Sequence, residues 1–454
     1  MDETPATHHQ ILLQGQSALQ RGDFREASRC FREVYAVAPD NLSAAVGLGL
    51  TVALSGDFQR GTDMLSVLFN HYPGEALVPE SLGMVYADSG RYAEAETWYR
   101  KAMRLGGFKP SLVCSLGMVL NELARFDEAA SMFKRCLRKN PEDISARYHL
   151  GLCQLLSGDY DAGWEGFQFR NRVVGRSEPE INAGLPRWDG QPLQGRSIVL
   201  LAEQGLGDTI QFARFATPLA AGGAKVFLFC DAALRDILGS IPGIAGVLTA
   251  DDPLPDLDYQ VAILDLPRIL GIIPATIPCR DTYLTVPATV KAGAAGLLDE
   301  KAAKRRVGLV WAGNPNHKTD HKRSMPLQAL SPVLGDPDTT FYSLQIGDAR
   351  RQLQEIPEAI RPREIFQAPL PLFELAGVMV ELDLLITVDT ALAHLAGALG
   401  VPVWALISRV PDWRWMLDRE DTDWYASMRL FRQTKIGDWS GVVDRVHARL
   451  PTVS

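Results

Sequence analysis

Three short stretches in the second half of the chain combine residues that can perform chemistry. The first spans residues 203–208 and has the sequence EQGLGD, between an expected strand and an expected helix. Gly205 and Gly207 let a ligand approach the backbone, and the start of the helix offers unpaired N–H groups. Asp208 can act as a general base. In a first helical turn it can also be a capping residue, so both interpretations stay open.

The second stretch, residues 311–324, has the sequence WAGNPNHKTDHKRS and follows an expected strand. From Lys301 to Arg323 the chain has seven basic residues against a single acidic one, Asp320. A phosphate or diphosphate group is the natural partner of such a patch, although a solvated basic loop is the alternative. The candidate ligands are Asn314, Lys318 and Arg323, with Gln345 at the end of a later strand as a candidate nucleotide contact.

The third stretch, residues 383–403, has the sequence DLLITVDTALAHLAGALGVPV, which is typical of strand, short turn, helix and strand. Asp389 and Thr390 are expected to cap the helix, and the free N–H groups of the next residues can hold a diphosphate. His394 lies one turn further on, either as a ligand contact or as a core histidine. The sequence Asp256-Leu257-Asp258 resembles a metal-binding DxD motif but lies in a Pro-rich turn, so we predict no metal site.

Alternating strands and helices would bring these stretches together. Short apolar runs predict strands at residues 197–202, 225–230, 247–248, 259–264, 282–286, 307–311, 340–344, 384–388 and 401–406. Helical segments between them, such as 208–219 and 391–399, predict parallel sheets with helices on both faces. We therefore expect two Rossmann-like halves, residues 197–295 and 296–454, with the site in a cleft between them. A dinucleotide fingerprint would need a small residue in place of Ile210, which disfavours a dehydrogenase.

The first third of the chain repeats itself every 34 residues. Glycine recurs at residues 15, 49, 83, 117 and 151, and Gly-Asp-aromatic or related triplets begin at 22, 56, 90, 124 and 158. Large apolar residues keep the same register, at Phe31, Leu65, Tyr99, Phe133 and Phe167. The pattern resembles the tetratricopeptide repeat (TPR) over residues 1–172, with residues 173–196 as a linker. Stacked helix pairs of this kind present a groove to a protein or peptide.

Composition argues against several classes of protein. The chain has 454 residues and a net charge of −8, and this acidic balance argues against a nucleic-acid partner. We expect no membrane span, because no apolar run reaches about 18 residues, and no secretory signal at the N-terminus. The six cysteines are scattered without a CxxC pair, which fits reduced thiols in a cytoplasmic protein.

The second and third stretches together resemble the heptosyltransferase and O-GlcNAc-transferase group of GT-B enzymes. With the repeats, the chain also resembles bacterial enzymes that glycosylate proteins such as flagellin. The resemblance implies that Asp208 is the base and that Asp389, Thr390 and His394 hold the donor diphosphate. It also implies that Lys318 and Arg323 belong to a basic loop that meets phosphate or sugar. No cofactor is expected, because the nucleotide diphosphate-sugar is a co-substrate.

We therefore expect an all-α TPR solenoid followed by an α/β GT-B module that acts as a glycosyltransferase. The expected reaction is an inverting, metal-independent transfer of a sugar to a Ser or Thr hydroxyl of a protein recruited by the repeats, with flagellin among the candidates. Two alternatives stay open. One is a non-catalytic TPR adaptor with a degenerate module, and the other is transfer to a glycan or a lipid-linked acceptor.

Overall fold

The computed structural model describes residues 5–182, 184–298, 303–317, 319–366 and 368–453. The chain forms two compact units, Met1–Cys153 (unit 1) and Gln154–Ser454 (unit 2). The division falls inside helix α9 (Ile144–Ser157). The boundary at residue 172 was drawn from the repeat pattern and stays a prediction.

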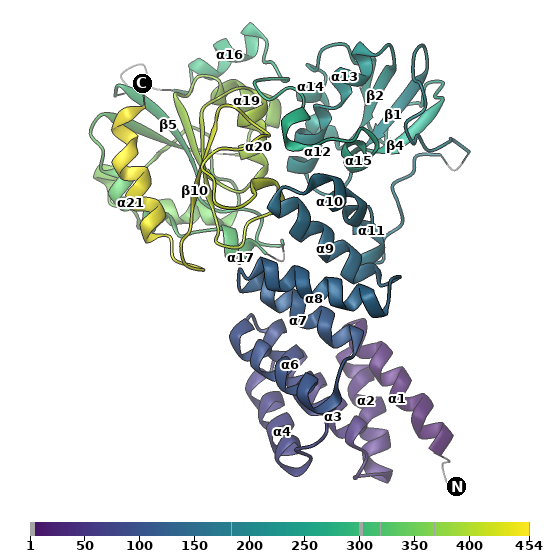
Figure 1. The fold of residues 1–454 in the computed structure, drawn as a ribbon. Helices are drawn as coiled ribbons and strands as arrows, with labels where there is room; N and C mark the ends of the chain where they lie inside the picture. The colour runs from purple at the N-terminus through teal and green to yellow at the C-terminus, as the bar shows by residue number, and fades with distance from the viewer. Residues whose placement is uncertain (1–4, 183, 299–302, 318, 367, 454) are drawn as a thin grey trace. The chain divides into compact units, whose positions relative to one another are not determined.

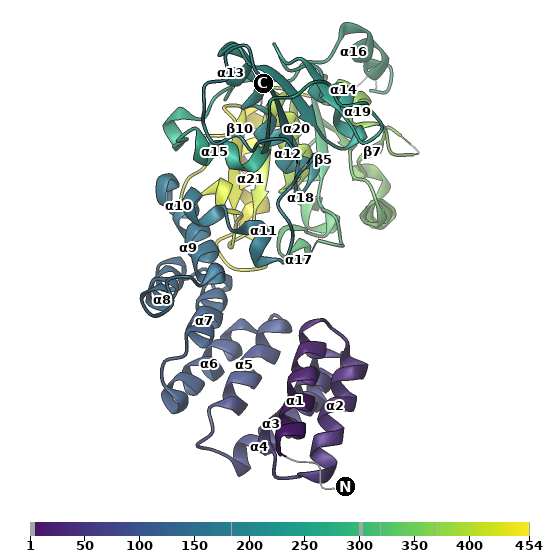
Figure 2. The same cartoon turned by 90° about the vertical axis from the view of Figure 1, so that its right-hand side faces the viewer.

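Unit 1 consists of helix pairs that follow one another along the chain (Figure 1). They are α1 (Pro5–Gln20), α2 (Phe24–Val37), α3 (Leu42–Leu54), α4 (Phe58–His71), α5 (Leu77–Asp88), α6 (Tyr92–Gly106), α7 (Pro110–Glu122) and α8 (Phe126–Lys139). Each odd-numbered helix packs against the next helix, and Figure 2 shows the pairs from the side. The predicted helical repeats are confirmed.

The turns between paired helices follow from the repeated triplets. Gly22 and Gly56 have φ of 75° and 113°, a left-handed region that glycine adopts without strain. The next residues, Asp23 and Asp57, then begin α2 and α4 by accepting a backbone N–H three residues on, at 3.0 and 3.2 Å. In each of these repeats the glycine therefore ends one helix, and the aspartate that follows it starts the paired helix.

The repeated glycines let the paired helices touch. A Cβ on Gly83 would lie 2.5 Å from Cδ1 of Tyr99, and one on Gly117 would lie 2.7 Å from Cε1 of Phe133. The aromatic ring of one helix therefore fills the space that a side chain on the other would need. This contact explains why glycine and large apolar residues share one register in the sequence.

Replacing Gly83 with Ala is expected to destabilise unit 1 by about 1–3 kcal/mol, the usual cost of overpacking a filled core. Gly74→Ala is the matched control, because a Cβ there has nothing within 4 Å. Urea unfolding followed by far-ultraviolet circular dichroism measures both. Equal midpoints for the two variants would contradict this account of the repeat.

Unit 2 begins with α10 (Tyr160–Phe167) and α11 (Arg170–Val173) and continues into a parallel four-stranded sheet. Its order is β3-β2-β1-β4, and the strands are β1 (Ser197–Leu201), β2 (Lys225–Phe229), β3 (Gly246–Leu248) and β4 (Tyr259–Ala262). The helices between them are α12 (Leu206–Ala213), α13 (Ala216–Ala221) and α14 (Arg235–Leu238), and α15 (Leu266–Ile269) follows β4. Strand β1 is buried along its whole length, as expected of a parallel strand covered on both faces.

A second parallel sheet follows helix α16 (Ala288–Ala295) and has the order β10-β9-β8-β5-β6-β7. Its strands are β5 (Arg305–Val310), β6 (Thr339–Ser343), β7 (Arg363–Glu364), β8 (Leu384–Val388), β9 (Val403–Ile407) and β10 (Met428–Arg432). The main helices are α18 (Ser331–Leu334), α19 (Leu372–Met379), α20 (Ala391–Ala398) and α21 (Ser440–Arg449). The predicted α/β class is confirmed, and the two sheets are consistent with a GT-B fold.

The predicted strand at 282–286 is wrong. The backbone N–H groups of Tyr283 and Leu284 both donate to the carbonyl of Ala398, at 3.1 and 3.2 Å, so this segment lies against the end of α20 rather than in a sheet. Strands β7 and β10 and helix α21 were not predicted.

Contacts between α12 and α20 and between α16 and α19 join the two halves of unit 2. Arg214 follows α12, is fully buried, and places its guanidinium 4.6 Å from the ring centroid of Tyr425. It also donates to Tyr283 Oη at 3.4 Å, and that hydroxyl donates to the carbonyl of Ile210 at 2.8 Å. A buried cation held by aromatic rings therefore links the first half to the segment that leads into the second.

Candidate functional site

Asp208 lies in the first turn of α12, beyond the carboxyl end of β1. Its Oδ2 accepts the backbone N–H of Gly205 at 3.0 Å, which confirms the capping interpretation. Its Oδ1 accepts a hydrogen bond from Arg414 Nη2 at 2.7 Å, a residue of the second half. The side chain keeps 16% of its surface exposed, so a third group can still approach the carboxylate.

Gly207 explains why the two halves approach so closely here. A Cβ at this position would lie 2.9 Å from Cδ2 of His394 and 3.2 Å from Cα of Ala391. Since Ala391 is the first residue of α20, the first turns of α12 and α20 lie side by side. The glycine loop of one half and the Asp-Thr turn of the other, separate in the sequence, thus meet.

Arg414 was not a predicted site residue, yet it connects the groups that were. In addition to its hydrogen bond with Asp208, Arg414 places its Nη1 3.4 Å from Nε2 of His394. Its Nε lies 3.1 Å from Asp412 Oδ1, in an ion pair that lacks the angle of a hydrogen bond. Burial opposes the charge on Arg414, but three carboxylates more than compensate and raise its pKa. They belong to Asp412, Asp208 and Asp389.

His394 is 2% exposed and stacks on Trp415, with 5.4 Å between ring centroids and 18° between planes. Burial, and then the cation of Arg414, hold the pKa of His394 well below its usual value, so the ring is neutral. Because Nε2 faces a guanidinium, we assign the proton to Nδ1, which donates to Tyr425 Oη at 2.9 Å. Both ring nitrogens are therefore in use, and a contact between His394 and a diphosphate stays a prediction.

Gln345 fixes the start of the basic loop. Its Oε1 accepts the backbone N–H groups of Trp311 and Ala312 at 3.0 and 2.9 Å. Its Nε2 donates to the carbonyls of Ala312 and Ile346 at 3.0 and 2.9 Å. These four bonds use the full capacity of the amide, so this buried side chain is a support of the loop, and a nucleotide contact stays a prediction.

Arg323 and Gly313 lie in close contact within the basic loop. Arg323 Nε donates to Asp320 Oδ1 at 3.1 Å, and Ser324 Oγ donates to the other oxygen at 2.8 Å. A Cβ on Gly313 would lie 2.8 Å from Arg323 Nη2, so only glycine fits beneath the guanidinium. Among the described residues, Nη1 and Nη2 of Arg323 have no partner, which leaves them available to an anion.

The remaining loop candidates are less constrained. Asn314 is exposed and accepts the backbone N–H of Asn316 at 3.0 Å in a local turn. Lys318 lies outside the described residues. His317, which sequence reasoning missed, accepts from Thr319 Oγ1 at 3.0 Å through Nδ1, which we assign as the unprotonated nitrogen.

His317 lies within the influence of charges from both halves. Partial desolvation lowers the pKa of His317, although its side chain is largely exposed, and the cation of Arg323 adds to this shift. The carboxylates of Asp320, Asp389 and Asp208 act in the opposite direction. The sequence signal that could have identified His317 as a site residue is a histidine in a basic loop that follows a strand.

Asp389 and Thr390 follow β8 directly and are partly exposed. Thr390 occupies the N-cap position of α20, but its side chain makes no capping bond. Instead its Oγ1 lies 3.2 Å from Thr387 Oγ1. The expected side-chain cap of α20 is therefore absent at Thr390, and the backbone N–H of Ala393 donates to the carbonyl of Thr390 at 3.0 Å instead.

A buried ion-pair network fixes Glu203, the residue that precedes the glycine loop in the chain. Arg170 donates from Nε to Glu203 Oε2 at 3.1 Å and, through Nη2, to Glu203 Oε1. Its Nη1 donates to Asp265 Oδ1 at 2.7 Å. Glu203 ends the segment after β1, so this network sets where the loop towards Gly205 begins.

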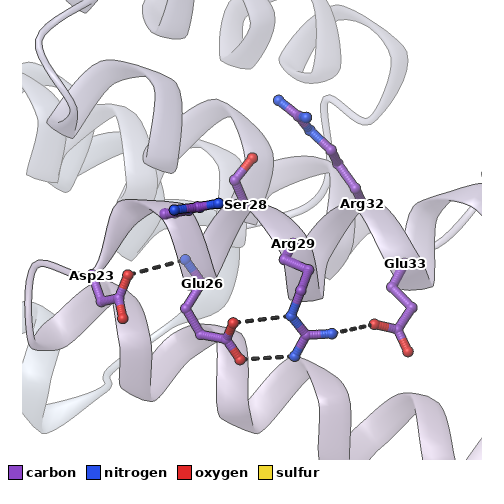
Figure 3. Close-up of a pocket in the computed structure, with 7 residues that line it drawn as sticks. Asp23, Glu26, Ser28, Arg29, Arg32 and Glu33 are labelled. Carbon is purple, nitrogen blue, oxygen red and sulfur yellow. Dashed lines mark hydrogen bonds and ion pairs between the residues drawn. The ribbon is translucent and has the colours of Figure 1, made fainter.

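Other charged and aromatic candidates have structural partners. Asp258 of the DxD-like sequence accepts from the backbone N–H and Oγ of Ser197, at 2.8 and 2.9 Å, and thus holds the start of β1. Trp413 packs among aromatic rings, including that of Trp164 with 5.2 Å between ring centroids, so its role is packing. In unit 1 a shallow hollow on α2 is lined by charges that pair with each other, such as Arg29 and Glu26 (Figure 3).

Comparisons with known proteins agree with this architecture. Tetratricopeptide repeat models match residues 12–61, 114–163 and 80–106. The model of glycosyltransferase family 9 (heptosyltransferase) matches residues 348–415, a segment that contains Asp389, Thr390, His394 and Arg414. The chain therefore combines TPR repeats with a segment similar to family 9 glycosyltransferases, which supports glycosyltransferase activity. None of the described helices is long and apolar enough to cross a membrane.

Protein FlbA of Caulobacter vibrioides (strain ATCC 19089 / CIP 103742 / CB 15) is 23% identical to the chain over 449 residues, which cover 93% of this chain and 75% of that protein. Among solved structures, MamA AMB-1 is 23% identical, with a TM-score of 0.28 over 38% of this chain and 96% of that chain. PilF of Pseudomonas aeruginosa is 17% identical, with a TM-score of 0.33 over 38% of this chain and 78% of that chain. Scores this low carry no further inference.

Proposed function

We propose that the protein transfers a sugar from a nucleotide diphosphate-sugar to a Ser or Thr hydroxyl of a protein, with inversion and without a metal. The observation that carries the proposal is the meeting of Asp208 with the first turn of α20, brought about by the close approach at Gly207. A carboxylate that can take a proton thus lies beside N–H groups that can hold a leaving diphosphate.

Positive groups of the second half suit the diphosphate of the donor, and we call them together the donor seat. The N–H groups at the start of α20 and the Nη1 and Nη2 groups of Arg323 suit the diphosphate, and Lys318 would add a further cation. Asp389 accepts hydrogen bonds only, so it suits a hydroxyl of the donor rather than a phosphate oxygen. Fixed donors of this kind stabilise the charge that grows on the leaving group, which is the task a metal performs elsewhere.

The transfer is a single displacement. Asp208 takes the proton of the acceptor hydroxyl, whose oxygen forms a bond to the anomeric carbon of the sugar. The bond from that carbon to the diphosphate breaks, and the nucleoside diphosphate leaves with the electron pair. Each oxygen of Asp208 accepts one hydrogen bond, so a lone pair remains on each for the incoming proton. The attack comes from the face opposite the leaving group, which inverts the anomeric configuration.

The TPR repeats favour a protein as the acceptor. TPR units bind proteins or peptides in a groove, and the chain devotes unit 1 to them. A protein acceptor, with flagellin as one candidate, explains why a transferase carries such repeats. Transfer to a glycan or to a lipid-linked acceptor would not need the groove, so the groove favours the protein acceptor over these two alternatives.

The test is thermal unfolding of the full chain with UDP, GDP, ADP and their sugars in the presence of EDTA. A nucleotide at about 100 times its Kd should stabilise the folded state by about 2.7 kcal/mol, which raises the Tm by several degrees. Arg323→Gln should abolish the shift, because it removes the free guanidinium at the donor seat. The absence of a shift with every nucleotide would favour the TPR adaptor.

Lys304→Gln is the matched control. It removes the same charge at the opposite end of β5, where Lys304 is 77% exposed and pairs with Asp338 at 3.2 Å. A loss of the nucleotide shift in this variant as well would mean that net charge, rather than a site at the loop, governs binding.

A further inference from the structure

The carboxylate that serves as the base is held by a residue of the opposite half. Asp208 stands at the start of α12, where a short side chain can adopt several rotamers. Its two oxygens are fixed by Gly205 N at 3.0 Å and by Arg414 Nη2 at 2.7 Å. The first contact is local to α12, so within the described part of the chain Arg414 is the residue that binds the carboxylate from the half that would hold the donor.

Arg414 is itself rigidly held. Its backbone N–H donates to Asp412 Oδ1 at 3.1 Å, and the same carboxylate lies 3.1 Å from its Nε. Its Nη1 faces Nε2 of His394, whose ring is stacked on Trp415. With 9% of the side chain exposed, the guanidinium has little freedom to leave this position.

We propose that Arg414 is a positioning residue that aims the Asp208 carboxylate at the reacting hydroxyl, so that one half supplies the base and the other half orients it. This inference rests on the proposed function. Arg414 touches neither substrate, and it acts on the reaction only through Asp208.

The local charge explains why Arg414 is not itself a seat for the diphosphate. Its guanidinium contacts the carboxylates of Asp208 and Asp412, at 2.7 and 3.1 Å, so an anion that approaches it meets more negative than positive charge. Arg323 differs, because among the described residues it pairs with Asp320 alone and keeps Nη1 and Nη2 available. The two arginines therefore have different roles, since Arg323 binds the donor and Arg414 binds the base.

The test is a double-mutant cycle of Asp208→Asn and Arg414→Gln in the full chain. The readout is release of nucleoside diphosphate to water from UDP-N-acetylglucosamine, GDP-mannose or ADP-glucose, which needs no protein acceptor. Arg414→Gln alone should lower kcat by about 100-fold, the effect of a misplacement of about 1 Å, and should change the donor KM by less than about 3-fold. In the Asp208→Asn background the same change should lower kcat by less than about 3-fold further.

Arg414→Lys should restore part of the lost rate, because an ammonium group can still pair with one carboxylate. Arg419→Gln is the matched control. Arg419 pairs with Asp421 at 2.7 Å and with Asp423 in the same C-terminal segment, and among the described residues it makes no ion pair or hydrogen bond with Asp208. It should leave kcat within about 3-fold of the wild-type value.

The same variants are compared by thermal unfolding, which needs no turnover. The Tm losses of Asp208→Asn and Arg414→Gln should be clearly less than additive if the two groups act as a pair. Additive losses in kcat or in Tm would overturn the inference, as would a rise in donor KM with kcat unchanged. Lack of nucleotide binding by the wild-type chain would instead count against the proposed function.

Discussion

Replacing Asp208 with Asn is expected to lower the rate of sugar transfer by about 10²- to 10⁴-fold, the usual contribution of a general base. Asn has the same size and can still accept a hydrogen bond from Arg414, but its amide cannot take the proton of a hydroxyl. Binding of the nucleotide diphosphate should persist, because the donor seat belongs to the other half. Release of nucleoside diphosphate measures the rate, and calorimetry measures the binding.

Asp256→Asn is the control for this variant. Asp256 is an exposed carboxylate of the same half, and it belongs to the DxD-like sequence. Its replacement should leave the rate unchanged. If Asp256→Asn abolished transfer and Asp208→Asn did not, the base would be misassigned and a role for the DxD-like sequence would return.

Replacing Arg170 with Ala should destabilise unit 2 by about 3–5 kcal/mol, because it removes one partner of a buried ion pair. The side chains of Arg170 and Glu203 are 1% and 6% exposed, so Glu203 would keep its charge in a site without water. Asp265 would lose the same partner. Eight of the nine tryptophans lie in unit 2, so denaturant unfolding followed by tryptophan fluorescence reports this unit.

Arg29→Ala is the counterpart on an exposed helix. Arg29 also pairs with two carboxylates, Glu26 at 2.7 Å and Glu33 at 2.8 Å, but more than half of its side chain is exposed (Figure 3). Water and salt screen such pairs, so its loss should leave stability almost unchanged. A similar effect of both replacements would show that burial does not govern the strength of the Arg170 network.

The repeats and most strands could be predicted because their signals are local and periodic. A glycine and an aromatic residue that pack together recur in one register, and buried parallel strands appear as short apolar runs. Helix α21 also had a signal, since Val442, Val446 and Leu450 recur at helical spacing. The error at 282–286 has another cause, because an extended apolar segment becomes a strand only where a sheet edge is free to pair with it.

The site was predicted only in part. Residues that follow strands could be expected to gather, because the carboxyl ends of parallel strands share one edge. Arg414 could not be found in this way, since it acts on Asp208 across 206 positions of sequence and lies in a short helical turn after β9. No local pattern distinguishes an arginine that pairs with a distant carboxylate from one that pairs with solvent.

The four hydrogen bonds of Gln345 bear on how such enzymes diversify. A single amide fixes where the basic loop leaves β5, and it does so through backbone atoms of Trp311, Ala312 and Ile346. The side chains of residues 314–317 are exposed and take no part in this anchoring. Natural variation at these positions can therefore change the proposed contacts with the donor while the path of the loop is retained, so under this proposal donor preference can drift within a lineage whose scaffold stays constant.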